Sequence, residues 1–88
     1  MRIIILYRPN SDHGRKMEDY ARDFIDVNPS MNVDLVSLET KEGADKAKSY
    51  DVTSYPAILV VDNSGAYQKL WQGEECPPLM QELASYAR

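Results

Sequence analysis

The run "RIIILY", from Arg2 to Tyr7, constrains the fold more than any other feature of this sequence. Apolar and β-branched residues follow one another without alternation, which is typical of a strand that is covered on both faces. Pro9, Asn10 and Ser11 then break the run. A central strand of this kind predicts a sheet with helices packed against each side.

A helix and a second strand are expected next. From Met17 onward the apolar residues recur at helical spacing, and Ser11 or Asp12 is a suitable N-cap. The helix is expected to end at Asn28, where "NPS" begins. The segment 32–38, "NVDLVSL", then has the pattern of a strand. Because a helix joins these two strands, we expect them to be parallel, with a right-handed crossover.

The middle of the chain predicts a second helix and then a hairpin. Thr40 can cap a helix that extends to Lys48 or Tyr50, with Ala44 and Ala47 on its packing side. Two β-rich runs, 57–62 and 67–72, are separated by a short polar loop with a glycine, Asn63 to Gly65, which predicts an antiparallel hairpin. Trp71, in the second of these runs, is expected to pack in the core.

The last helix is expected to start at Pro77 and Pro78, since proline is tolerated in the first turn. Leu79, Leu83 and Tyr86 would form its apolar face. The order is therefore β-α-β-α-β-β-α, an α/β single domain over residues 1–88 with a mixed four-stranded sheet and helices on both faces.

Composition excludes several classes of function. Ten Lys and Arg against 14 Asp and Glu give a net charge of −4, which disfavours nucleic acid and anionic membrane surfaces as partners. A single cysteine and a single histidine exclude an internal disulfide and a Cys/His zinc site, and we expect no metal. No apolar run approaches the ~20 residues that span a bilayer, and no leader precedes the first strand, so a cytoplasmic protein is expected.

The second half of the chain, "DVTSYPAILVVDNSGAYQKLWQG", resembles the thioredoxin-like superfamily at its minimal, glutaredoxin-like size. The match implies a sheet order of 2-1-3-4, with the first and third helices on one face and the second on the other. It places the family's cis-proline at Pro56, in "YDVTSYPAILVV", and the family's glycine at Gly73. The resemblance covers nearly the whole chain.

The redox motif of that family is missing. Four residues after Tyr7, "SDHG" occupies the place of Cys-X-X-Cys, so Ser11 and Gly14 stand where the two cysteines would be. Thiol–disulfide exchange needs a thiolate, which neither residue supplies. Ile5 also replaces the buried aspartate of some relatives. We expect dithiol chemistry to be absent, and we expect cysteines introduced at 11 and 14 to form a disulfide with little loss of stability.

Four residues are candidates for a catalytic role. Ser11, Asp12 and His13 are the residue types of a hydrolytic triad, but adjacent residues entering a helix point about 100° apart, so capping is the better interpretation. Cys76 precedes Pro77 at an expected helix N-terminus, which would favour a thiolate, while Glu74 and Glu75 oppose it.

The leading hypothesis is a non-catalytic domain, without cofactor, that binds a peptide or protein segment as a monomer or weak dimer. In the family, the residue before the cis-proline pairs with an extended peptide. The expected partner-binding face is made of Tyr7, Arg8, Ser11, Asp12, His13, Gly14, Arg15, Tyr55, Pro56, Gly73 and Glu74. One alternative is a glutathione-linked or monothiol oxidoreductase that uses Cys76. A second is self-association through Trp71 and an edge strand.

Overall fold

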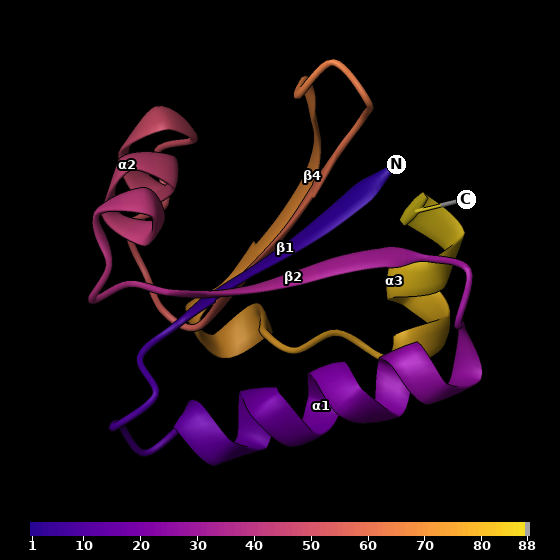
Figure 1. Cartoon of the computed structure of the whole chain (residues 1–88), viewed down its shortest axis with the longest axis horizontal. Helices are drawn as coiled ribbons and strands as arrows, with labels where there is room; N and C mark the ends of the chain where they lie inside the picture. Colours follow the sequence, from indigo (N-terminus) through magenta and orange to yellow (C-terminus); the bar gives the residue numbers. More distant parts are fainter. Residues whose placement is uncertain (88) are drawn as a thin grey trace.

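A computed structural model describes residues 1–87 as three layers, with a sheet between helices (Figure 1). The elements in chain order are β1 (Arg2–Tyr7), α1 (Gly14–Val27), β2 (Asn32–Ser37), α2 (Lys41–Ser49), β3 (Ala57–Val61), β4 (Tyr67–Gln72), the 3-10 turn η1 (Gly73–Glu75) and α3 (Met80–Ala87). All seven expected elements are present. The 3-10 turn is an addition that the sequence patterns did not predict.

The four strands form one mixed sheet in the order β2-β1-β3-β4, as expected. β1 and β2 are parallel, with Arg2 opposite Asn32 and Tyr7 opposite Ser37. β3 runs antiparallel to both β1 and β4. The carboxyl end of β1 and the start of β3 therefore meet at the same end of the sheet.

The continuous apolar run of β1 is explained by burial on both faces, since Ile3 to Tyr7 are all buried. Ile3 and Ile5 pack with the inward residues of α1 and α3, whereas Ile4 and Leu6 pack with those of α2. The first and third helices thus share one face and the second covers the other, which confirms the expected arrangement. Trp71 is also buried, with 4% of its surface exposed, as predicted.

The start of α1 differs from the expectation. The N-cap position is His13 rather than Ser11 or Asp12, and no side chain caps the described helix. The Ser11 hydroxyl instead donates to the carbonyl of Arg8 at 2.7 Å, so it stabilises the loop before the helix. α1 ends at Val27, and Asn28 is its C-cap, as expected; the Asn28 backbone N–H donates to the Phe24 carbonyl.

Thr40 caps α2 as predicted, because its hydroxyl accepts from the backbone N–H of Gly43 at 3.0 Å. The packing side of this helix was partly wrong. Ala47 is buried, but Ala44 is exposed and Gly43 takes the inward position instead. A Cβ on Gly43 would lie 2.1 Å from the Ser37 carbonyl oxygen, so the helix start lies directly against the end of β2.

α3 begins at Met80, later than predicted, and residues 76–79 connect η1 to the helix. The Cys76–Pro77 peptide bond is cis. Leu83 is buried as expected, but Leu79 is 78% exposed and Tyr86 42% exposed. Ala84 and Ala87 complete the inward face in their place. None of the described helices is long and apolar enough to cross a membrane.

Candidate functional site

The loop between β1 and α1 is folded by its own polar groups. The Arg8 carbonyl accepts from the backbone N–H of Ser11 at 3.2 Å as well as from the Ser11 hydroxyl. The Arg8 backbone N–H donates to Nε2 of His13 at 3.1 Å. Because the serine hydroxyl and the imidazole acceptor are both bound to backbone, Ser11, Asp12 and His13 do not form a hydrolytic triad, in agreement with the sequence interpretation.

Gly14 is buried at the start of α1, where a side chain has no space. A Cβ there would lie 2.2 Å from the Pro9 carbonyl oxygen and 2.9 Å from the Arg8 carbonyl oxygen. The expectation that cysteines at 11 and 14 would be accommodated with little loss of stability is therefore wrong. The helix can approach the loop this closely only because residue 14 has no Cβ.

The segment before β3 is held by β4 and the residue that follows it. Oε1 of Gln72 accepts from the backbone N–H of Thr53 at 2.9 Å and of Ser54 at 3.1 Å. The N–H of Gly73 donates to the Pro56 carbonyl at 3.0 Å. Gly73 has φ +62°, the left-handed region that favours glycine. Sequence reasoning missed Gln72, because a glutamine at the end of an edge strand carries no distinguishing signal.

Tyr55 lies between these two segments, and the Tyr55–Pro56 peptide bond is cis. Neither the backbone N–H nor the carbonyl of Tyr55 has a hydrogen-bond partner within residues 1–87. The ring is half-buried, its hydroxyl donates to the Val52 carbonyl at 3.3 Å, and the Arg8 guanidinium carbon lies 5.9 Å from the ring centroid. A cation over an aromatic face at this distance is attracted to it. Arg8 thus connects the β1–α1 loop to the segment before β3.

The other expected face residues are unequally accessible. Asp12, Arg15 and Glu74 are exposed, and Ser11, His13, Pro56 and Gly73 are half-buried. Tyr7 is 6% exposed and belongs to the core, with its hydroxyl donating to Oε2 of Glu18 at 2.9 Å. Burial, and then Glu18, raise the pKa of Tyr7. Tyr7 and Gly14, which were expected on the face, are therefore buried beneath it.

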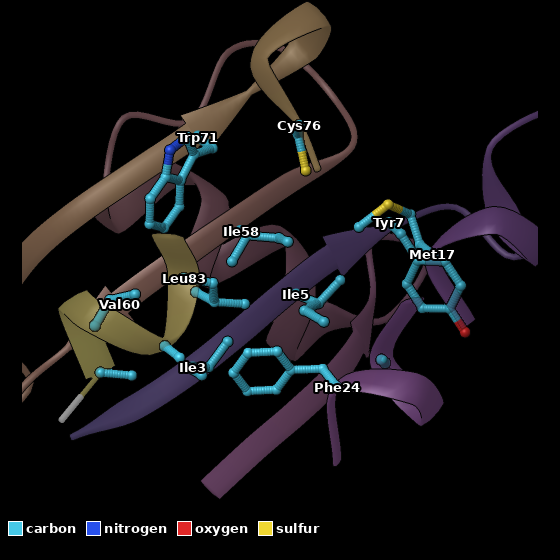
Figure 2. Close-up of a cluster of buried hydrophobic side chains, with 13 residues drawn as sticks. Ile3, Ile5, Tyr7, Met17, Phe24, Ile58, Val60, Trp71, Cys76 and Leu83 are labelled. Atoms are coloured by element: carbon cyan, nitrogen blue, oxygen red, sulfur yellow. The ribbon is translucent and has the colours of Figure 1, made fainter. Parts of the chain in front are cut away.

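Cys76 follows η1 and does not lie at a helix N-terminus, contrary to the expectation. It is 7% exposed and packs in the cluster on the α1–α3 side of the sheet (Figure 2). Burial raises the pKa of the Cys76 thiol to about 12, although the nearby Lys16 acts in the opposite direction. Burial, rather than the neighbouring glutamates, is what opposes the thiolate.

A separate hollow of the structure includes neither the expected face residues nor Cys76. A polar hollow of about 340 Å³ lies at the opposite end of the sheet, where Arg2, Lys46 and the turn at Asp62 line it. Among the side chains of residues 1–87, no cluster of three or more His, Cys, Asp or Glu could hold a metal ion.

No family model and no curated protein matches the sequence. Solved structures of thioredoxins do match the fold. The oxidised thioredoxin from Plasmodium falciparum has 17% identity and a TM-score of 0.76, covering 98% of this chain and 80% of that one. Thioredoxin O2 from Arabidopsis thaliana has 9% identity and a TM-score of 0.78, covering 99% and 75%. Thioredoxin 1 from Thermosipho africanus has 11% identity and a TM-score of 0.72, covering 98% and 93%. The chain therefore has a small thioredoxin-like fold, and the lone Cys76 cannot form the family's dithiol pair.

Proposed function

We propose that this domain binds an extended peptide or protein segment without catalysis at the Tyr55 face, defined as Arg8, Ser11, Asp12, His13, Arg15, Tyr55, Pro56, Gly73 and Glu74. One observation carries the proposal: the backbone N–H and carbonyl of Tyr55 have no partner within the described chain. Backbone N–H and carbonyl groups need a hydrogen-bond partner, so this unpaired donor and acceptor favour a ligand that can pair with them. An extended segment supplies a complementary carbonyl and N–H, as in strand addition to a sheet edge.

The surroundings of Tyr55 support a prepared site. Gln72 orders the residues before Tyr55, Gly73 bonds to the residue after it, and Arg8 covers its ring. A backbone that is already ordered loses less entropy when a ligand binds. An extended chain segment can contribute main-chain hydrogen bonds and place alternate side chains against such a surface.

Two observations support the absence of thiol chemistry. They are the residues at the two positions of the missing motif and the environment of Cys76. Ser11 and Gly14 carry no sulfur. With a pKa of about 12, Cys76 would be a thiolate in only about one molecule in 10⁵ at pH 7, and the thiolate is the reactive form. A monothiol oxidoreductase would need Cys76 to be accessible and ionised, and its burial opposes both conditions.

The binding hypothesis is tested by selecting a decapeptide from a random library against the full chain and measuring its affinity by fluorescence anisotropy. Gln72→Leu removes the acceptor for two backbone N–H groups, whereas Gln72→Glu keeps an oxygen acceptor. We expect Gln72→Leu and Arg8→Gln to weaken binding at least about tenfold, which corresponds to about 1.4 kcal/mol. Gln72→Glu should retain most of the affinity.

Arg2→Gln is the matched control for Arg8→Gln. Both remove one exposed positive charge, but Arg2 lies opposite Val61, at the end of β3 that is farthest from Tyr55. Equal losses in the two variants would show nonspecific electrostatic attraction and would contradict binding at the Tyr55 face. Binding that disappears with Cys76→Ala and is unaffected by Arg8→Gln would instead favour the thiol-based alternative.

A further inference from the structure

The only histidine of the chain, His13, accepts a hydrogen bond, and this bond determines the charge state of its ring. Nε2 of His13 accepts from the Arg8 backbone N–H at 3.1 Å. An imidazole nitrogen that accepts a hydrogen bond carries no proton, so the ring is neutral and its proton is on Nδ1. Protonation of Nε2 would place two N–H groups against each other and would abolish this bond.

Arg8 connects this hydrogen bond to the Tyr55 face. Its backbone is held on one side by His13 and on the other by the two bonds from Ser11, and its guanidinium lies over the ring of Tyr55. Loss of the His13 bond leaves the Arg8 N–H unpaired and frees the residue whose side chain covers Tyr55. The state of the imidazole is therefore coupled to the residue that the proposed ligand would contact.

Two charged groups near the ring act in opposite directions. Partial burial and the positive charge of Arg8 lower the pKa of His13, and Asp12 raises it. The lowering effects are larger, which agrees with the neutral ring that the hydrogen bond requires. An imidazolium would also lie close to the Arg8 guanidinium, and like charges at short distance repel each other.

We propose that His13 is a positioning residue for the Tyr55 face: its neutral ring holds Arg8 over Tyr55, and protonation of the ring releases Arg8 and weakens binding of the peptide segment. The inference rests on the proposed function and assigns to it a dependence on pH. Because one proton is involved, the dissociation constant of the peptide rises by at most about tenfold for each pH unit below the pKa of His13 in the unbound protein. Above that pKa the affinity should be constant.

The first experiment uses the free protein, so its outcome does not depend on any ligand. The His13 ring signals are followed by NMR from pH 7.5 to pH 5.0, and ¹⁵N correlations identify the nitrogen that carries the proton at high pH. We expect Nδ1–H at pH 7.5, and we expect the Arg8 amide and the Tyr55 ring signals to shift with the same midpoint as His13. His13→Gln keeps an acceptor that does not titrate, so these shifts should disappear in that variant.

The second experiment measures the affinity of the selected decapeptide at the same pH values. We expect the wild-type affinity to fall by at most about tenfold per pH unit below the His13 midpoint, whereas the affinity of His13→Gln should not change with pH. His13→Leu removes the acceptor and should bind weakly at every pH. Matched variants that differ only at residue 13 thus separate the effect of the hydrogen-bond acceptor from the effect of the charge.

The two experiments distinguish the two claims. If no decapeptide binds at the Tyr55 face, the proposed function fails, while the coupling of His13 to Arg8 still stands on the titration of the free protein. If the Arg8 and Tyr55 signals do not follow the His13 midpoint, the inference is overturned. It is also overturned if wild type and His13→Gln lose affinity equally at low pH.

Discussion

Gly14→Ala is the substitution that most directly probes the packing beneath the Tyr55 face. The added Cβ would lie 2.2 Å from the Pro9 carbonyl oxygen and 2.9 Å from the Arg8 carbonyl oxygen, both backbone atoms. Overpacking costs about 1–3 kcal/mol, and displacing the Arg8 carbonyl weakens its two bonds from Ser11, at about 1 kcal/mol each. Alanine recovers at most about 1 kcal/mol of helix propensity.

The free energy of unfolding should therefore fall by about 2–4 kcal/mol. An 88-residue domain has a total stability of about 4–13 kcal/mol, so the loss is a large fraction of it. The expected decrease in Tm is roughly 10–25 °C. Urea unfolding is followed by the fluorescence of Trp71, the single and buried tryptophan. Lys48→Ala, at an exposed helix position, is the control and should change stability by less than about 0.5 kcal/mol. A Gly14→Ala protein as stable as wild type would refute the close approach of α1 to Pro9.

Three further predictions concern other residues. His13 has a lowered folded pKa, so its contribution to stability is fully present above the unfolded value of 6.5 and is lost as the pH falls from there towards the folded value. Urea midpoints between pH 7.5 and pH 5 should show this loss, and His13→Gln should flatten it. Cys76 should react with iodoacetamide at pH 8 roughly a hundred- to a thousandfold faster in urea than in the folded protein, since folding raises the pKa of its thiol from 9.0 to about 12; equal rates would contradict its burial. Asp62 accepts from the Ser64 hydroxyl at 2.6 Å and from the backbone N–H groups of Ala66 and Ser64 in the hairpin turn at 2.9 Å each, and these bonds lower its pKa. Asp62→Ala should increase hydrogen exchange at both amides, whereas unchanged exchange would show that the turn does not depend on this carboxylate.

The fold was predictable because its signals are periodic and local. The unbroken apolar run of β1, the helical stripe of α1 and the glycine turn of the hairpin each specify an element, and the order of elements allows few topologies. The predictions that were wrong concern residues whose burial depends on contacts with segments distant in the sequence. Gly43 rather than Ala44 faces inward because α2 starts against the Ser37 carbonyl, and such a close approach leaves no periodic signal.

For the candidate site, the resemblance predicted the cis bond before Pro56, which the structure shows. It also assigned contact roles to Tyr7 and Gly14, which the structure places in the interior. The acceptor role of His13 depends on where the loop places Arg8, five residues earlier, and the role of Gln72 depends on a segment 18 residues away. Neither distance corresponds to a pattern that a single sequence displays.

The central claim, that an extended segment pairs with the backbone of Tyr55, is tested most directly by the Tyr55 amide itself. Amide spectra of the ¹⁵N-labelled protein are compared with and without a saturating amount of the selected decapeptide. We expect the Tyr55 N–H to form a hydrogen bond with the peptide, so its signal should move downfield and its exchange with solvent should slow. Changes at the edge strands β2 or β4, with the Tyr55 amide unaltered in shift and exchange, would contradict pairing at Tyr55.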